Sequence, residues 1–326
     1  MSKNKEITLT LIVKNEEKTL ANCLSSFAIL YDLIQIIDTG SIDRTKEIAL
    51  KYGAEIYDFE WIHDFSAARN FGLKKVKTEW IMTVDADDVI EEEDKNNLIN
   101  HFLADNSSDI FVLPYIYIGT KTNPQTINRQ PRIWKSNLNL KYIRPIHERL
   151  SLPENAKIKN LDIPIIHTKT NPIQASVQRN LKILNEHIKN NPEDHETAYY
   201  LGMEYSNLGD NIKSIEFYEK YLQLEPCNTT NTHHAHTKLG IIKMQQGKII
   251  DAKKHFQTSI KLQPKVIDSY LFLAEIEMHL FSPTNAIKLL SIAKELKSPP
   301  ANINFCNPHL YSGKADQLLQ IALSKL

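Results

Sequence analysis

Short apolar runs alternate with helix-patterned segments along the first part of the chain. The runs that read as β-strands are 7–13, 33–37, 54–57 and 80–84. The segments between them, whose apolar residues recur every three or four positions, are 18–30, 43–52 and 65–76. Strands that alternate with helices of this length predict βαβ units and a parallel sheet. Asp43 is the expected N-cap of its helix, and Gly53 the expected residue just past its end.

The strand pattern continues beyond a predicted helix over 91–103, but its character changes. A long apolar run covers 110–118, and shorter strand-like pieces follow around 132–134 and 142–143. This part is expected to form a mixed sheet. We therefore expect one domain in two parts, the first of which ends near Leu103 and the second near Thr170.

From Ile173 onward the apolar pattern is helical almost without a break, and it repeats. Leu201-Gly202 recurs as Leu239-Gly240 and again as Leu273-Ala274. The interval from position 240 to position 274 is 34 residues, the tetratricopeptide period. The earlier interval is longer because 228–231 reads as an insertion. After a bridging helix over 175–189, each unit is expected to pair two helices around a glycine turn, and a helix over 311–326 to cap the array.

Composition narrows the class of protein. The 326 residues contain 39 Lys plus Arg and 39 Asp plus Glu, so no global basic field indicates nucleic acid or an anionic membrane. No apolar stretch approaches the roughly 20 residues of a membrane span, and the N-terminus leads straight into a strand without a signal peptide. Cys23, Cys227 and Cys306 are few, odd in number and far apart, which favours a reducing cytoplasm. A cytoplasmic protein with two domains, 1–170 and 171–326, is expected.

The most informative polar pattern is Asp85-Ala86-Asp87-Asp88, directly after the apolar run 80–84. Carboxylates this close repel one another, and each raises the cost of ionising the next. A chain tolerates such a cluster when a cation lies among them, and hard divalent ions prefer carboxylate and phosphate oxygens. Open α/β sheets bind ligands at the carboxyl ends of their strands. The pattern predicts a metal–diphosphate site; the alternative is a solvated acidic loop that caps the next helix.

Four motifs, taken in order, resemble the family 2 glycosyltransferases. They are Val13-Lys14-Asn15-Glu16-Glu17, Ile37-Asp38-Thr39-Gly40-Ser41-Ile42-Asp43, Ala68-Arg69-Asn70 and Asp85-Ala86-Asp87-Asp88. Two later motifs are similar to the subgroup with tetratricopeptide repeats behind the catalytic domain, which includes peptide glycosyltransferases that modify glycocin bacteriocins: Pro131-Arg132-Ile133-Trp134 and Ile146-His147-Glu148. The resemblance implies an α/β domain of GT-A (Rossmann-like) fold over 1–170 and an all-α tetratricopeptide repeat domain over 171–326. In the first domain, the nucleotide half would end near Leu103 and the acceptor half near Thr170. The resemblance also implies a UDP-sugar donor and Mg²⁺ or Mn²⁺ as cofactor.

The resemblance places seven residues at the nucleotide sugar: Val13, Glu16, Asp38, Arg69, Asp85, Ala86 and Asp87. Asp38, at the carboxyl end of a strand, could accept hydrogen bonds from the base or ribose, or be only a turn aspartate. Glu16 could face the nucleotide or simply lie near a helix N-terminus, where the macrodipole favours it. The guanidinium of Arg69 could fork onto phosphate or carboxylate oxygens; its alternative is a surface pair with Asp64 or Glu79.

The metal ligands also follow from the resemblance. Asp85 would touch the ribose or the metal, and Asp87 would coordinate Mg²⁺ or Mn²⁺. The role of Asp88 stays open. His167 matches a histidine often found near the end of this catalytic domain, and it is a candidate ligand of the metal or the diphosphate.

Glu148 is the candidate general base. An inverting displacement needs a carboxylate on the acceptor side that takes the acceptor proton. His147 could instead be the base, orient Glu148, or be an ordinary interior histidine. Glu148 in turn could only pair with Arg144 or Arg149.

The function expected from these motifs is metal-dependent, inverting transfer of a hexose from a UDP-sugar to a Cys or Ser side chain of a peptide or protein. Helical repeats favour a peptide because they present extended binding surfaces. One alternative keeps the donor but places the acceptor on a glycan or a lipid-linked saccharide. The other is a tetratricopeptide adaptor that carries an inactive transferase domain. A homodimer through the last repeats stays possible.

Overall fold

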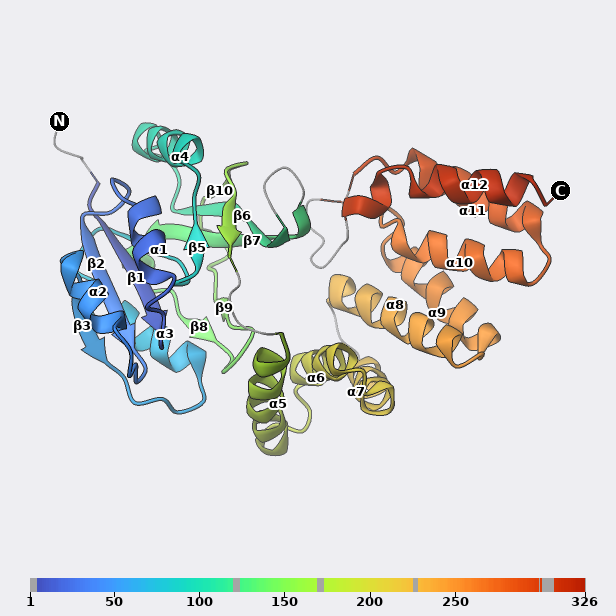
Figure 1. Ribbon diagram of the computed structural model, residues 1–326, viewed down its shortest axis with the longest axis horizontal. Coiled ribbons are helices and arrows are strands. Elements are labelled where there is room, and N and C mark those ends of the chain that lie inside the picture. Colours follow the sequence, from blue (N-terminus) through green and yellow to red (C-terminus); the bar gives the residue numbers. More distant parts are fainter. Residues whose placement is uncertain are drawn as a thin grey trace. The chain divides into compact units, whose positions relative to one another are not determined.

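The chain folds into two compact units, Met1–Thr170 and Asn171–Leu326 (Figure 1). The computed structural model describes residues 5–119, 124–168, 173–224, 228–298, 300 and 308–325. Cys227 and Cys306 lie outside the described residues. Among the described helices, none is long and apolar enough to cross a membrane.

Unit 1 is built on a mixed β-sheet. Its order over the described residues is β3-β2-β1-β4-β7-β6-β11-β5, and β10 pairs with β6. The strands are β1 Ile7–Val13, β2 Leu33–Asp38, β3 Glu55–Asp58, β4 Trp80–Thr83, β5 Asp88–Val89, β6 Ile110–Gly119, β7 Pro124–Lys135, β10 Ile158–Asn160 and β11 Ile165–His167. A separate two-stranded sheet joins β8 Tyr142–Ile143 to β9 Arg149–Leu150.

The sheet changes direction at β7. Strands β1, β2, β3 and β4 are mutually parallel, whereas β7 runs antiparallel to both β4 and β6. Val13 lies opposite Asp38, and Thr10 lies opposite Thr83. The carboxyl ends of β1, β2 and β4 therefore meet at one edge. The predicted parallel part and the predicted mixed part are both confirmed.

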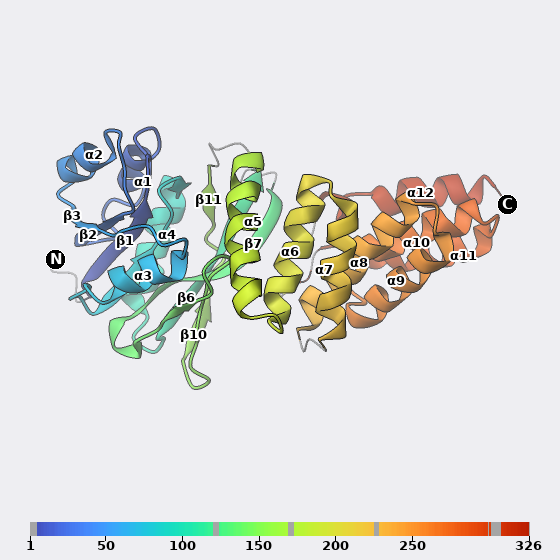
Figure 2. The ribbon, with the colours of Figure 1, turned by 90° about the horizontal axis from the view of Figure 1, so that it is seen from below.

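Helices cover both faces of this sheet (Figure 2). They are α1 Leu20–Ser26, α2 Thr45–Lys51, α3 Phe65–Leu73 and α4 Glu92–Ala104. Side chains alternate across a strand, so Leu9 and Leu11 of β1 join the core beneath α1, α2 and α4. Thr10 points to the other face, where Gln35 donates a hydrogen bond to it and another to the carbonyl of Gly72 in α3. The polar residues of this second face thus fix α3 in place.

The start of α2 differs from the prediction. The helix begins at Thr45 after Arg44, so Asp43 is not its N-cap. The carboxylate of Asp43 instead accepts the backbone N–H groups of Thr45 and Glu17. It therefore ties the loop after β1 to the loop after β2, because both loops reach the same edge of the sheet.

Unit 2 is helical throughout its described residues. Its helices are α5 Ile173–Asn190, α6 His195–Leu208, α7 Asn211–Gln223, α8 Thr229–Gln245, α9 Ile249–Leu262, α10 Asp268–His279, α11 Pro283–Glu295 and α12 Lys314–Leu323. Gly209 and Gly247 adopt the left-handed backbone that the α6–α7 and α8–α9 turns require, at φ of 82° and 73°. The predicted pairs of helices joined by glycine turns are confirmed.

The repeated glycines inside the helices have a different purpose. A Cβ atom on Gly202 would lie 2.7 Å from the ring of Tyr218, and one on Gly240 would lie 2.7 Å from the ring of Phe256. Each glycine therefore lets an aromatic ring of the second helix press against the backbone of the first. The recurring Leu-Gly dipeptide marks this contact.

Gly240→Ala tests that contact. At an ordinary helical position the change stabilises by up to about 1 kcal/mol. Here overpacking against Phe256 should reverse the sign and cost about 1–3 kcal/mol, measured as the free energy of unfolding of the full chain in urea. Adding Phe256→Leu should restore part of the loss. A higher unfolding midpoint for Gly240→Ala alone would contradict the close approach seen here.

Candidate active site

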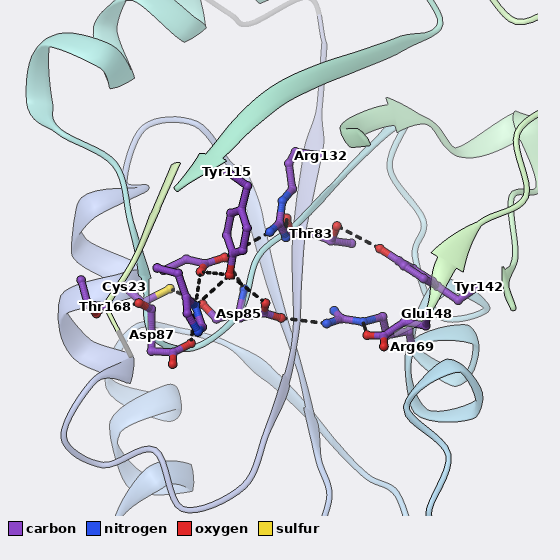
Figure 3. Close-up of polar contacts among 12 residues, drawn as sticks. Cys23, Arg69, Thr83, Asp85, Asp87, Tyr115, Arg132, Tyr142, Glu148 and Thr168 are labelled. Carbon is purple, nitrogen blue, oxygen red and sulfur yellow. Dashed lines mark hydrogen bonds and ion pairs between the residues drawn. The ribbon is translucent and has the colours of Figure 1, made fainter. Parts of the chain in front are cut away.

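Acidic and basic side chains converge beyond the carboxyl ends of β1, β2 and β4 (Figure 3). Asp85 follows β4, and one of its oxygens accepts a 2.7 Å hydrogen bond from Nη2 of Arg69. Nε of the same guanidinium donates at 2.7 Å to Oε1 of Glu148. Arg69 thus joins the predicted nucleotide side to the predicted base. Neither surface pair suggested for Arg69 is needed to explain it.

Helix α3 holds the segment that carries Glu148. The side chain of Asn70 donates to the carbonyl of Tyr142 and accepts its N–H, both at 2.8 Å, so it imitates a neighbouring strand for β8. The N–H of Phe65 donates to the carbonyl of Pro145. These contacts place the residues after β8 beside Arg69. Each residue of the motif Ala68-Arg69-Asn70 thus has its own contact: Ala68 is buried in the protein, Arg69 pairs with the two carboxylates, and Asn70 holds β8.

The acidic cluster is only partly exposed to solvent. Asp88 is fully buried, and its Oδ2 accepts the N–H of Asp85 at 2.8 Å. Its Oδ1 accepts a hydrogen bond from the hydroxyl of Tyr115 at 2.7 Å and lies 3.0 Å from Nδ1 of His167. A second buried guanidinium, that of Arg132, lies 3.7 Å from Oδ2. The alternative of a solvated acidic loop is therefore wrong.

His167 reaches the cluster because β11 pairs with β5, which places it opposite Asp88. Ligand atoms of Asp85, Asp88 and His167 lie within 4.8 Å of one another, a spacing that could hold a metal ion. Oδ1 of Asp87 lies 3.3 Å from Nδ1 of His167. Both the N–H and the hydroxyl of Thr168 donate to the carbonyl of Asp87, which fixes the loop.

The charges of this cluster are unevenly compensated. Although burial opposes ionisation, Arg69 and Arg132 hold the pKa of Asp85 well below its usual range. Burial raises the pKa of Asp87 to about 7; His167 counteracts this, and the neighbouring carboxylates of Asp85 and Asp88 add to it. A cation beside Asp87 would favour its ionised form.

The sequence matches known glycosyltransferases. The model of the family described as glycosyl transferase family 2 matches residues 8–170, half of the chain. The chain belongs to glycosyl transferase family 2. A tetratricopeptide repeat model matches 195–227, which covers α6 and α7. The chain is therefore a glycosyltransferase with helical repeats behind its catalytic domain.

Three similar proteins cover different parts of the chain. The SPbeta prophage-derived glycosyltransferase SunS of Bacillus subtilis is 26% identical over 304 residues, which cover 86% of this chain and 70% of SunS. A TPR repeat-containing protein of Synechococcus elongatus is 29% identical over 143 residues, 44% of this chain and 35% of that protein. Among solved structures, glucosyl-3-phosphoglycerate synthase from Mycobacterium tuberculosis aligns with a TM-score of 0.40 at 14% identity, covering 56% of this chain and 78% of that one.

Asp38 and Glu16, two of the residues predicted to bind the nucleotide, lie at the carboxyl-end edge of the sheet. Asp38 ends β2, and its Oδ1 accepts the N–H groups of Gly40 and Ser41 as a turn aspartate does. Its Oδ2, however, is buried and lacks a hydrogen-bond partner among the described residues. Oδ1 therefore fits the interpretation of Asp38 as a turn aspartate, and Oδ2 fits the interpretation of Asp38 as an acceptor for the base or ribose. Burial, together with the charges of Asp43 and Asp85, raises the pKa of Glu16 despite its hydrogen bond from Thr19.

Val13 and Ala86 contribute differently from the charged residues. Both side chains are buried in the hydrophobic core. The carbonyl of Val13 accepts from the N–H and the hydroxyl of Thr39, so it holds the loop after β2. Any contact of these two residues with a nucleotide stays a prediction.

His147 lies beside Glu148 in a strained turn. His147 has a φ of 52° and Arg144 a φ of 80°, a left-handed backbone that non-glycine residues seldom adopt. Strain of this kind persists only where surrounding contacts impose it, and the bonds from Asn70 and Phe65 supply those contacts. The roles of His147 and Glu148 in proton transfer stay predictions.

Three residues of the site were not predicted from the sequence. Tyr115 and Arg132 meet the acidic cluster from β6 and β7, and Asn70 pins β8. Arg132 stood in a recognised motif, Pro131 to Trp134, which was a signal. Tyr115 offered none, since a tyrosine in an apolar strand is an ordinary core residue.

Arg69→Met tests the bridge. Removing one partner of a buried ion pair leaves uncompensated charge and typically costs about 3–5 kcal/mol; here both Asp85 and Glu148 would lose their guanidinium. The expected result is a large fall in the free energy of unfolding, measured in urea. Arg44→Met is the matched control, because Arg44 pairs with Glu47 in solvent and should change nothing measurable. Equal effects of the two changes would show that the bridge is not formed.

Proposed function

We propose that the protein is a metal-dependent, inverting glycosyltransferase that moves a hexose from a UDP-sugar to a Cys or Ser side chain of a peptide or protein. One observation carries the proposal: ligand atoms of Asp85, Asp88 and His167 lie within 4.8 Å of one another at the edge of the sheet, and Oδ1 of Asp87 lies 3.3 Å from Nδ1 of His167. Asp38 lies at the same edge, because it is the last residue of β2, the strand that pairs with β1. Its buried Oδ2 has no hydrogen-bond partner among the described residues.

The residues at this edge fit a divalent cation. Asp87, Asp85 and His167 would hold it. The two carboxylates are ligands that suit Mg²⁺, and Mn²⁺ accepts both the carboxylates and the imidazole. Asp87 is the natural ligand because its side chain is 17% exposed, whereas that of Asp88 is fully buried. When bound, the ion supplies charge that stabilises the departing diphosphate.

The nucleotide end of the donor is assigned to Asp38 and Glu16. A uracil N–H or a ribose hydroxyl donated to Oδ2 of Asp38 would satisfy a buried acceptor whose desolvation is otherwise uncompensated. Glu16 lies after β1 at the same edge, and its pKa is raised by burial and by nearby carboxylates including Asp85. Arg69 acts here through Asp85, whose carboxylate it orients at 2.7 Å.

The acceptor proton is assigned to Glu148. Arg69 engages Oε1 of Glu148 and so orients the carboxylate, which leaves Oε2 as the oxygen that takes the proton from the attacking group. A serine hydroxyl needs this base most, because a cysteine thiol ionises near pH ~8.5 unaided. Arg69 holds Glu148 and Asp85 through two neighbouring nitrogens, so the proposed base lies close to the proposed donor site.

The choice of a peptide acceptor rests on the second unit. Stacked helix pairs give an extended surface of the kind that binds peptides, and one of these pairs matches a tetratricopeptide repeat. The relative SunS, which is aligned over 86% of this chain, is itself named a glycosyltransferase. Transfer in the cytoplasm is part of the proposal and agrees with three cysteines that are far apart in the sequence.

Asp87→Asn tests metal dependence. We expect the unchanged protein to release UDP slowly from a UDP-sugar when Mn²⁺ is present and no acceptor is added. The variant should lose roughly 10²-fold or more of this rate, because it loses stabilisation of the leaving group. Asp162→Asn, at a solvent-exposed carboxylate, is the control and should retain the rate. Equal rates with and without Mn²⁺ would overturn metal dependence.

Mass spectrometry tests the acceptor. The protein is incubated with Mn²⁺, a panel of UDP-hexoses, and matched peptides that contain Cys, Ser or neither. A mass gain of one hexose on the Cys or Ser peptides alone is the expected result. A gain confined to oligosaccharides or lipid-linked saccharides would overturn the peptide assignment, although family 2 activity would stand.

A further inference from the structure

The hydroxyl of Tyr115 lies among the candidate metal ligands without being one of them. It is 2.7 Å from Oδ1 of Asp88, 2.7 Å from Nδ1 of His167 and 3.3 Å from Oδ2 of Asp85. The side chain is 3% exposed and comes from β6, a strand from the second part of the unit. One buried phenol therefore touches three residues of the cluster.

A phenol has one proton to donate and lone pairs to accept with. With the ordinary pKa of a phenol at about 10, the hydroxyl carries its proton at neutral pH. That proton goes to the carboxylate of Asp88, the stronger acceptor at 2.7 Å. The oxygen can then accept from Nδ1–H of His167. One hydroxyl thus contacts both Asp88 and His167 and can fix the orientation of both side chains.

Arg132 fixes the ring that carries this hydroxyl. Its guanidinium carbon lies 4.3 Å from the centre of the Tyr115 ring, and Nη1 donates to the carbonyl of Thr83. Nη2 is 3.7 Å from Oδ2 of Asp88. Because Arg132 is 3% exposed, its charge is only weakly screened by solvent.

The oxygens of Asp88 are consequently occupied from within the protein. Oδ1 has Tyr115 and His167, and Oδ2 has the N–H of Asp85 and the charge of Arg132. Asp87 differs, because its side chain is 17% exposed and its Oδ1 lies 3.3 Å from Nδ1 of His167. The two neighbouring aspartates thus have distinct surroundings.

We propose that Tyr115, with Arg132 stacked on its ring, is a positioning residue that holds Asp88 and His167 in the orientation needed for metal binding, with Asp88 as internal anchor instead of ligand. The inference rests on the proposed metal-dependent function. It assigns a role to Asp88, which the motif left open. It also distinguishes the residues that would contact the ion from those that orient these ligands.

Tyr115→Phe tests the inference, because it removes the hydroxyl and keeps the stacked ring. Partners that orient metal ligands typically contribute 10–100-fold to metal affinity, so the dissociation constant of Mn²⁺, measured by electron paramagnetic resonance on the full chain, should rise by about that factor. The half-saturating Mn²⁺ concentration for UDP release should rise in parallel, and excess Mn²⁺ should restore the rate. Tyr31→Phe is the control: its hydroxyl donates to the carbonyl of Leu24, and its loss should leave Mn²⁺ affinity unchanged.

Asp88→Asn completes the test. If Tyr115 acts through Asp88, the double variant should bind Mn²⁺ about as weakly as the weaker single variant, because residues that act as one unit are not additive. Asp87→Asn should instead abolish detectable binding. Should Tyr115→Phe unfold, Arg132→Lys, which keeps the charge but loses the planar stack, must show the same weakening of Mn²⁺ binding.

Two results would overturn the inference, and they are distinguishable. Unchanged Mn²⁺ affinity in folded Tyr115→Phe, with metal-dependent UDP release intact in the unchanged protein, would reject the positioning role alone. Absence of Mn²⁺ binding and of metal-dependent UDP release in the unchanged protein would reject the metal site itself, and the positioning role with it.

Discussion

The balance of buried charge beyond β4 governs the architecture of the first unit. Four carboxylates gather there, those of Asp85, Asp87, Asp88 and Glu148, against two guanidinium groups, those of Arg69 and Arg132. Charges taken out of water are expensive unless they are paired and hydrogen-bonded. The arginines pair with Asp85, Asp88 and Glu148, whereas Asp87 has, among the described residues, only His167 as a cationic neighbour. Burial and the neighbouring carboxylates raise the pKa of Asp87 to about 7, and a cation beside it would favour its ionised form.

Much of the fold follows from local sequence pattern. The predicted first strand coincides with β1, and the predicted second and fourth strands differ from β2 and β4 by one residue at one end. Period-two and period-3.6 patterns depend only on which face of an element is buried. The edge where Asp38 and Asp85 lie could therefore be placed from the sequence, because parallel strands end together. Helix ends were less accurate, as at Thr45, since caps depend on neighbouring loops.

The partners of the charged residues could not be read from local sequence. For Arg69 the sequence offered Asp64 and Glu79, and for Glu148 it offered the flanking arginines, all close along the chain. The structure joins Arg69 to Glu148 across 79 positions. Such pairs depend on which segments the topology brings together, here α3 and the turn after β8. Tyr115 and Arg132 stayed unassigned for the same reason, because only the pairing of β6 and β7 aligns them with the acidic cluster.

The pairing of β6 and β7 also shows that residues from both predicted halves of the catalytic unit form one site. The nucleotide half, ending near Leu103, supplies Asp38, Arg69 and the acidic cluster. It lacks the groups that neutralise and orient that cluster, namely Tyr115, Arg132 and His167, which β6, β7 and β11 deliver. Without them Asp88 would be a buried carboxylate with three of its four described partners missing, a state that costs far more than the loss of one exposed charge. The metal edge therefore exists only once the chain has returned through Thr168 to close the loop at Asp87, so folding of the whole unit is a precondition of binding at that edge.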